Sequence, residues 1–156
     1  MMWHRSMFVI AALAGCTCGS SKPDGAAPST GRAERSVVAM SGPALAEKEY
    51  YRLDLAGEPA CKAAAPCDVK IALTALAGHK INVEYPTKFE PGVTAGLGVG
   101  ATEFTVETPT RGVMSIRVTP ASAGTHTLNG QFKLGVCTDD KCEIDGPKIA
   151  LPVTAI

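Results

Sequence analysis

Two closely spaced pairs of cysteines are the residues of this sequence best suited to chemistry. Cys61 and Cys67 have five residues between them, and Cys137 and Cys142 have four. Cysteines in a small exported chain form disulfides, because that compartment is oxidising. Four cysteines allow three connectivities, and proximity along the chain favours the two local bonds. We expect Cys61–Cys67 to be a structural disulfide.

The Cys137–Cys142 pair is better placed for exchange. Closing a ring of about six residues contributes only about 2 kcal/mol, so stapling alone is a weak reason for this pair. Val136 belongs to the inward set of its expected strand, so Cys137 lies at the strand end, facing outward or at the rim. A partner thiolate can attack an accessible sulfur. We therefore assign Cys137 and Cys142 as candidate catalytic residues for thiol–disulfide exchange.

Carboxylates outnumber bases around this pair. Nearby negative charge raises the pKa of a thiol, and the single base Lys141 opposes this effect only in part. The pair therefore differs from a thioredoxin-like C-x-x-C nucleophile and is better suited to accept electrons from a partner, or to become active on docking. The acidic residues are Asp139, Asp140, Glu143 and Asp145.

Two other interpretations stay open. In the first, both pairs only staple loops of a binding or scaffold module. In the second, the four cysteines bind a metal, for which soft sulfur ligands favour copper(I), although the five-residue gap is looser than a zinc knuckle. We expect no metal and no cofactor. His79 and His126 stand far apart, and we expect each to be a polar turn or surface residue.

Short β-strands must hold these cysteines. From about residue 48, apolar and polar residues alternate with period two in seven runs separated by Gly, Pro and Asp turns. This pattern predicts an all-β fold over residues 44–156, an immunoglobulin-like antiparallel β-sandwich of about seven to eight strands. The apolar members are Tyr51, Leu53, Leu55; Val69, Ile71, Leu73; Ile81, Val83, Tyr85; Phe104, Val106; Met114, Ile116, Val118; Leu128, Phe132, Leu134, Val136; and Ile149, Leu151, Val153.

Glycine and proline locate the edges and loops. Pro152 cannot donate to a ladder, so we expect the last strand at an edge or paired on one side only. The Ala-rich stretch 60–66 is interrupted by prolines and is interpreted as a loop. The glycine-rich stretch Gly92–Gly100 precedes no helical pattern, so we expect a mobile loop and no phosphate cradle.

The segment LNGQFKLGVCTDDKC, from Leu128 to Cys142, resembles the last strands of the N-terminal, immunoglobulin-like periplasmic domain of the thiol:disulfide interchange protein DsbD. That family has a glycine, alternating apolar residues, C-x(4–5)-C and a final apolar strand. The stretch Gly78–Phe89 resembles the edge of the same sandwich, and the likeness covers roughly residues 67–156.

This resemblance implies that Cys137 and Cys142 accept electrons from a membrane electron-transfer domain and pass them to periplasmic thioredoxin-fold proteins. The sequence has neither the family's transmembrane helices nor its thioredoxin domain, so a relay would need separate partners. The family's shielding loop is not matched. Phe89 is a candidate shield, and a core position is its simpler interpretation.

The start of the chain is typical of an export signal. Arg5 precedes the apolar run Met7–Ala14, which is far shorter than a membrane span. The run ends Leu13-Ala14-Gly15-Cys16, which resembles the lipobox of bacterial lipoproteins. The resemblance implies a signal peptide over residues 1–15 and lipidation of Cys16, which would anchor the protein in the lipid bilayer of the cell envelope. Thr17 favours the outer membrane, with the domain facing the periplasm.

Residues 16–43 are rich in Ser, Gly, Pro and Ala and are expected to form a flexible tether after the lipidated Cys16. Cys18 is the odd cysteine, and its fate is left open. The 15 basic and 15 acidic residues balance, so nucleic acid is not expected as a partner.

Overall fold

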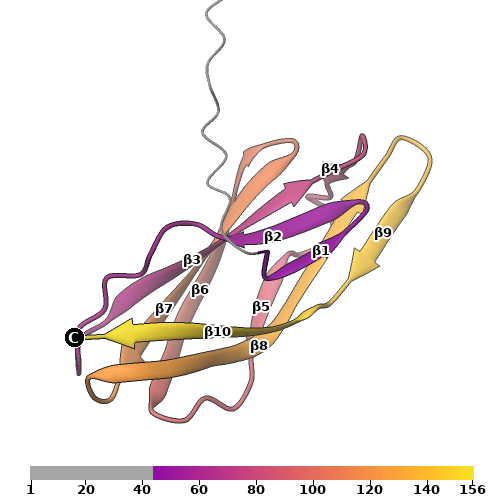
Figure 1. The fold of residues 1–156 in the computed structure, drawn as a ribbon. Coiled ribbons are helices and arrows are strands. Elements are labelled where there is room, and N and C mark those ends of the chain that lie inside the picture. The colour runs from indigo at the N-terminus through magenta and orange to yellow at the C-terminus, as the bar shows by residue number, and fades with distance from the viewer. Residues whose placement is uncertain (1–43) are drawn as a thin grey trace, which may run out of the picture. The chain divides into compact units, whose positions relative to one another are not determined.

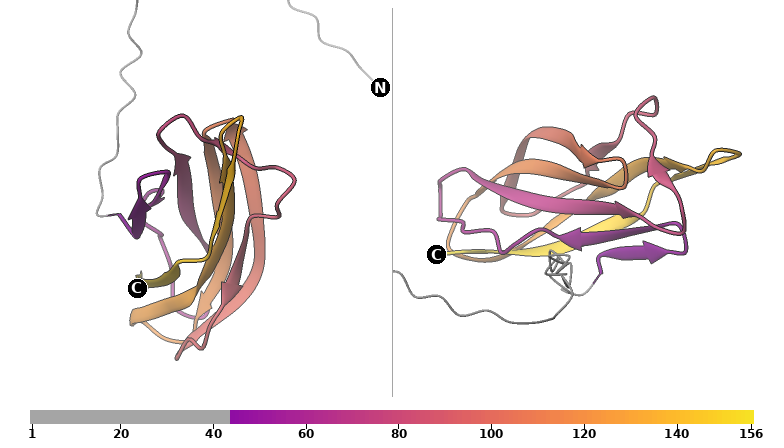
Figure 2. Two further views of the ribbon diagram at one scale, coloured as in Figure 1. Left: turned by 90° about the vertical axis from the view of Figure 1, so that its right-hand side faces the viewer. Right: turned by 90° about the horizontal axis from the view of Figure 1, so that it is seen from above.

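The computed structural model describes residues 44–156, which form two packed antiparallel β-sheets (Figure 1, Figure 2). The expected signal peptide 1–15, the lipidation site Cys16, the tether 16–43 and Cys18 lie outside the described residues. Within the described part, no helix is long and apolar enough to cross a membrane.

The first sheet has five strands in the order β1-β2-β3-β7-β6. They are β1 (Ala46–Lys48), β2 (Tyr51–Leu55), β3 (Cys67–Ala75), β7 (Arg111–Pro120) and β6 (Leu97–Thr108). Among residues 44–156, the β6 strand pairs only with β7, so β6 forms one edge of this sheet.

The second sheet is built around β8 (Gly124–Cys137), the long orange strand of Figure 1. Its first part pairs with β10 (Lys148–Ala155) and its last part with β9 (Cys142–Asp145), both on one side. On its other side β8 pairs with β5 (Lys88–Pro91) and β4 (Lys80–Ile81). Four short strands therefore hold one long strand.

The alternation expected from the sequence is confirmed on the strands that face the core. Leu128, Phe132, Leu134 and Val136 of β8 are fully buried and share one parity. They meet the inward residues of the first sheet in a single apolar cluster. The fold is an all-β, immunoglobulin-like sandwich, and the short strands β1, β5 and β9, added to the seven expected runs, bring the described strands to ten.

The strand expected over residues 81–85 is cut short, and this part of the prediction is wrong. Only Lys80–Ile81 pair with β8, and Val83 is 76% exposed. The side-chain oxygen of Asn82 accepts hydrogen bonds from the backbone N–H groups of Glu84 (2.9 Å) and Tyr85 (3.3 Å). Such side-chain bonds give the backbone an alternative to the ladder, so the chain turns out of the sheet at this point.

The loop expected over Gly92–Gly100 is also partly wrong, because β6 begins at Leu97. Leu97 is buried and pairs with Pro120, and Val99 pairs with Val118 two residues later. Glycine occupies every second position here, so the segment lacks the alternation of apolar and polar side chains that is typical of a strand. The inward residues nevertheless repeat with the two-residue period of a strand.

The expectations for Pro152, Phe89 and His79 have different outcomes in the structure. Pro152 lies on β10, which pairs with β8 on one side, as expected for an edge strand. Phe89 is buried in the core, so the simpler of its two interpretations holds. His79 was expected to be a polar turn or surface residue. It closes a turn, its N–H donating to the carbonyl oxygen of Leu76 at 2.9 Å, but the surface position is wrong, because its side chain is buried and its ring packs against Tyr50.

A partly buried polar contact joins β9 to the edge of the first sheet. The Tyr51 hydroxyl donates to the Asp145 carboxylate at 2.8 Å, and Lys48 Nζ lies 2.7 Å from the same carboxylate. Burial of Asp145 alone would raise its pKa, but the hydrogen bonds from Lys48, Tyr51 and the Gly146 N–H outweigh burial and lower the pKa. Burial and the bond to Asp145 both raise the pKa of Tyr51, so its phenol remains a donor.

We predict that Asp145→Asn destabilises the domain by about 1 kcal/mol at neutral pH, because a charge-assisted hydrogen bond becomes neutral while the exposed Lys48 pairing adds little. A carboxyl group with a depressed folded pKa contributes stability that is present above its unfolded pKa and is lost as the pH falls through the folded value. The difference between wild type and variant should therefore shrink below about pH 4, as measured by urea unfolding.

Asp139→Asn is the matched control, because the Asp139 side chain is almost fully exposed and meets only Lys80, at 3.4 Å. Its unfolding free energy should stay close to that of wild type at every pH. Parallel pH curves for wild type and Asp145→Asn would contradict the prediction.

Close packing at Gly130 gives a second prediction. A Cβ at Gly130 would lie 2.2 Å from the Phe89 ring and 2.7 Å from the carbonyl oxygen of Glu90. Gly130→Ala should therefore cost about 2 kcal/mol of unfolding free energy, because both strands must shift. Gly98→Ala, whose nearest contact would be an ordinary 3.5 Å, should change it by less than about 0.5 kcal/mol. Equal unfolding midpoints for the two variants would show that β5 adjusts freely.

Candidate functional site

The structure contains both local disulfides and thereby selects one of the three connectivities. Cys61 is bonded to Cys67 and Cys137 to Cys142. The pairing that proximity favours is confirmed among the described residues. The two bonds lie in different surroundings, and they therefore differ in how easily a thiolate from solvent can reach them.

The Cys61–Cys67 disulfide is the less exposed of the two bonds, with Cys61 buried and Cys67 half-buried. Cys61 is 3% exposed and belongs to the apolar core. Its backbone forms a parallel bridge with Ala155 at the end of β10, and the N–H of Ile156 donates to its carbonyl oxygen at 3.1 Å. Cys67 begins β3 in the other sheet. This bond therefore fastens the two sheets together at the C-terminal end of β10.

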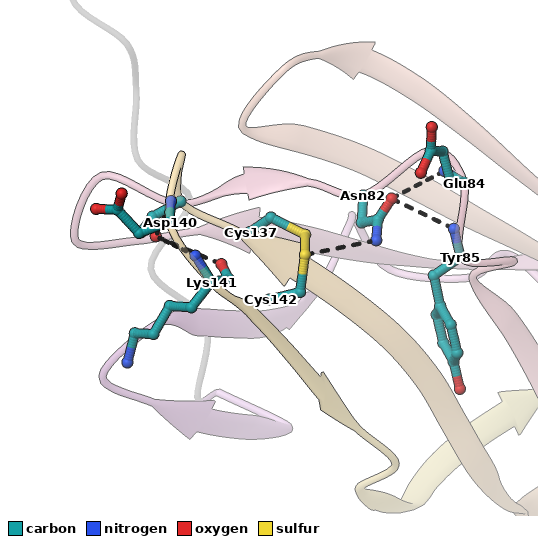
Figure 3. Close-up of a disulfide and its surroundings, with 8 residues drawn as sticks. Asn82, Glu84, Tyr85, Cys137, Asp140, Lys141 and Cys142 are labelled. Carbon is teal, nitrogen blue, oxygen red and sulfur yellow. Dashed lines mark hydrogen bonds between the residues drawn. A yellow bond between two sulfur atoms is a disulfide. The ribbon is translucent and has the colours of Figure 1, made fainter.

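The Cys137–Cys142 disulfide lies at the surface, where β8 ends and β9 begins (Figure 3). The two cysteines are a cross-strand pair in the register of β8 and β9. Cys142 is exposed and Cys137 is half-buried, as the parity of Val136 predicts. A thiolate arriving from solvent can therefore reach this bond, whereas the buried sulfur of Cys61 is closed to it.

A tight turn sets the distance between these two strands. The Thr138 N–H donates to the carbonyl oxygen of Lys141 at 2.8 Å. The Thr138 hydroxyl oxygen also accepts the N–H groups of Asp140 (3.4 Å) and Lys141 (3.2 Å). The turn is held by its own hydrogen bonds, so it does not rely on the disulfide alone to close.

The strand β4 adds two residues that the sequence analysis did not place at the pair. Lys80 is the cross-strand neighbour of Cys137 on the side opposite Cys142. The side-chain nitrogen of Asn82 lies 3.9 Å from the sulfur of Cys142 and donates to it. Both residues lie in the Gly78–Phe89 stretch, so the resemblance marked the segment but not these side chains.

The charges at the site are partly neutralised in pairs. Lys80 lies 3.4 Å from Asp139, and Lys141 lies 2.9 Å from Glu143. The hydrogen bond to Glu143 raises the pKa of Lys141, so this lysine stays charged. Asp145, the fourth acidic residue of the sequence pattern, faces Tyr51 and Lys48 at the other end of β9. The sulfur atoms therefore meet a more balanced field than the sequence predicts.

Metal-ligating side chains do not gather at this site. Within residues 44–156, no group of three or more His, Cys, Asp or Glu side chains is arranged to hold a metal ion. Both cysteine pairs are consumed by disulfides, which leaves no thiolate for a soft ion in this state.

Comparisons with known proteins identify the fold. No protein-family model matches the chain. No curated protein matches it either. The crystal structure of the yeast GGA1 GAE domain is similar, with a TM-score of 0.50 and 13% identity over 70% of this chain and 97% of that chain. The GAE domain of GGA2p from Saccharomyces cerevisiae has a TM-score of 0.48 and 11% identity over 70% of this chain and 96% of that chain. The first likeness shows an immunoglobulin-like β-sandwich and nothing beyond the fold.

Proposed function

We propose that this chain is a membrane-anchored envelope lipoprotein whose Cys137–Cys142 pair exchanges disulfides with thioredoxin-fold proteins in the periplasm. The observation that carries this proposal is the contrast between the two disulfides. In one bond Cys61 is buried in the core and Cys67 is half-buried, whereas the other bond presents Cys142 to solvent at the rim of the second sheet. Exposed disulfides are the ones that exchange, because an attacking thiolate must approach one sulfur directly.

The rest of the site supports exchange without unfolding. The Thr138–Lys141 turn is closed by hydrogen bonds that do not involve the sulfur atoms, so we expect them to persist when the sulfur–sulfur bond opens. The core beneath the pair is filled by Val136 and Leu134, whose side chains pack in the core without the disulfide. Both redox states can therefore share one backbone, which an electron carrier needs in order to cycle.

The reaction is a transfer of two electrons between sulfur pairs. A partner thiolate attacks one sulfur of the disulfide, and a mixed disulfide forms as the other cysteine leaves as a thiolate. The partner's second thiolate then attacks the mixed bond and releases the dithiol form of Cys137 and Cys142 while the partner becomes a disulfide. The reverse sequence passes the electrons to the next partner, so no cofactor is required.

Two likenesses in the sequence support this proposal. The Leu128–Cys142 segment resembles the DsbD N-terminal domain, in which a cysteine pair at the end of an immunoglobulin-like sandwich relays electrons. The Leu13–Cys16 segment resembles a lipobox, which would tether the domain to the envelope and keep it near membrane-bound donors. Outer-membrane sorting with the domain facing the periplasm belongs to the same proposal.

The binding or scaffold alternative requires the opposite property of the same bond, namely that it stays closed. In that case the Cys137–Cys142 disulfide would only hold the β8–β9 hairpin. Its reduction would then be difficult, and its removal would loosen β9 and the Asp145 contact that follows it. The two functions are therefore separable by measurement.

We predict that the Cys137–Cys142 disulfide has a reduction potential above about −230 mV, in the range of exchanging pairs, because it is exposed and its hairpin is held by other bonds. The less exposed Cys61–Cys67 bond should lie below about −300 mV, as structural disulfides do. Equilibration of the full-length protein in graded thiol buffers, followed by alkylation and peptide mass spectrometry, gives both values. Trypsin cuts after Lys62, Lys133 and Lys141, so each of the four paired cysteines falls in its own peptide.

A matched pair of double variants provides the control for this test. Cys137→Ala with Cys142→Ala should fold normally and lose capture of thioredoxin-fold proteins as mixed disulfides. Cys61→Ala with Cys67→Ala should lose about 2 kcal/mol of unfolding free energy and keep capture. A potential below about −300 mV for Cys137–Cys142, with unfolding of its double variant, would leave the scaffold function in its place.

We predict that Cys16→Ala abolishes membrane anchoring. Expressed in a Gram-negative bacterium, the wild-type protein should incorporate labelled fatty acid and partition with the membrane fraction, whereas the variant should do neither, because the cysteine at the lipobox position that would carry the lipid is gone. Cys18→Ala is the matched control and should leave labelling unchanged. Labelling that survives in Cys16→Ala would remove the lipoprotein part of the proposal.

A further inference from the structure

We propose that Asn82 is a positioning residue that holds a hydrogen-bond donor against the sulfur of Cys142 and thereby makes Cys142, rather than Cys137, the attacking thiolate of the reduced protein. This inference rests on the proposed exchange function. It starts from the contact between Asn82 Nδ2 and Cys142 Sγ at 3.9 Å (Figure 3).

The orientation of the Asn82 amide is fixed by its other hydrogen bonds. Its oxygen accepts the backbone N–H groups of Glu84 at 2.9 Å and Tyr85 at 3.3 Å. Those two donors require an oxygen, so the opposite end of the amide, which faces the sulfur, must be the NH₂ group. The Asn82 N–H also donates to the carbonyl oxygen of Gly135 at 2.9 Å, which ties the residue to β8.

A glycine on β8 leaves space for this arrangement. The strands β4 and β9 flank β8 on opposite sides, so the Asn82 side chain must reach over the outer face of β8 to meet Cys142. At that point β8 carries Gly135, and a Cβ there would lie 3.1 Å from Tyr85. The absence of a side chain at Gly135 lets the turn that begins at Asn82 lie close to the strand.

The donor matters more in the reduced state than in the oxidised one. A disulfide sulfur is a weak acceptor, whereas a thiolate carries a full charge and accepts a strong, charge-assisted hydrogen bond. A donor that favours the charged form increases the fraction of thiolate at a given pH. Cys142 is also the more exposed residue of the two, so the donor and access to solvent both favour the same cysteine.

Cys137 has different surroundings. It is half-buried at the end of β8, and its cross-strand neighbour Lys80 directs its ammonium group toward Asp139 at 3.4 Å. We therefore assign Cys137 the role of the resolving cysteine.

The electrons balance in two steps. The Cys142 thiolate attacks a sulfur of an oxidised thioredoxin-fold partner, a Cys142–partner bond forms, and the partner's other cysteine leaves as a thiolate that takes a proton from water. The Cys137 thiolate then attacks Cys142 Sγ, the Cys137–Cys142 bond forms, and the partner's first cysteine leaves. The pair is oxidised by two electrons, and the partner disulfide is reduced to a dithiol.

The test measures each cysteine separately. Fully reduced full-length protein is pulse-alkylated with iodoacetamide across a pH series, and tryptic peptides report Cys137 and Cys142 individually. In wild type, Cys142 should react faster than Cys137 at neutral pH. In Asn82→Asp and Asn82→Ser its rate should fall by about five- to tenfold with an upward shift of the pH midpoint, because one lost donor corresponds to roughly one pH unit of thiolate titration. The Cys137 profile should stay in place.

The two substitutions distinguish the loss of a hydrogen-bond donor from the addition of a negative charge. Both keep an oxygen that can accept the Glu84 and Tyr85 N–H groups, so the turn is retained, but only Asn82→Asp adds a negative charge. A slower Cys142 in Asn82→Asp alone would show charge repulsion and overturn the proposal. Asn129→Asp makes the same chemical change at another position, on β8, where the amide donates to the carbonyl oxygen of Val93. It should leave both rates unchanged. Unchanged rates in both Asn82 variants would likewise overturn the proposal.

Trapping of the partner completes the test. Cys137→Ala should accumulate a mixed disulfide through Cys142, and Cys142→Ala should not, with an oxidised thioredoxin as the probe. Mixed disulfides that form only through Cys137 would overturn the assignment while leaving the exchange function intact. A wild-type protein that never reacts with thioredoxin would remove the exchange function, while the alkylation profiles would still report on Asn82.

Discussion

The pairing of β8 on both sides is the constraint on which the second sheet depends. A 14-residue strand has more backbone donors and acceptors than any one short neighbour can satisfy, and unpaired groups are costly in a protein interior. Here β10 and β9 complete one side and β5 and β4 the other. Because side chains alternate between faces, the same strand supplies the core with one set of residues and the surface with the other. Cys137 belongs to the outer set because Val136 belongs to the inner one.

The alternation along the chain predicted the core well, and it failed where side chains compete with the ladder. The inward residues of β3, β7, β8 and β10 could be identified because each strand places its large apolar side chains on one face. Val83 fits the same alternation and is nevertheless exposed, because the Asn82 amide captures two backbone N–H groups and ends the strand. Leu97 was missed for the opposite reason, since glycines around it conceal a strand. Neither effect is visible in hydrophobicity alone.

The candidate site was only half accessible from the sequence. The positions of Cys137 and Cys142 follow from local spacing and strand parity, both of which are short-range properties. Lys80 and Asn82 lie more than fifty residues earlier in the chain and reach the pair through the register of β4 on β8. Register between strands distant in sequence depends on the whole sandwich. For the same reason, the sequence pattern overestimated the negative charge around the pair. It did not place Lys80 beside Cys137.

The free edge of the sandwich has a consequence for how densely such domains can be crowded. In the part of the chain that the structure describes, β6 has one strand partner, β7, and leaves a row of backbone groups on its other side, which in principle offers a template for another chain. Its pairing with β7 is broken by register shifts between Val99 and Thr102 and between Val106 and Thr108. Such irregularities twist an edge away from a straight ladder. Many copies held on one surface could then stand side by side without joining into a continuous, fibre-like sheet.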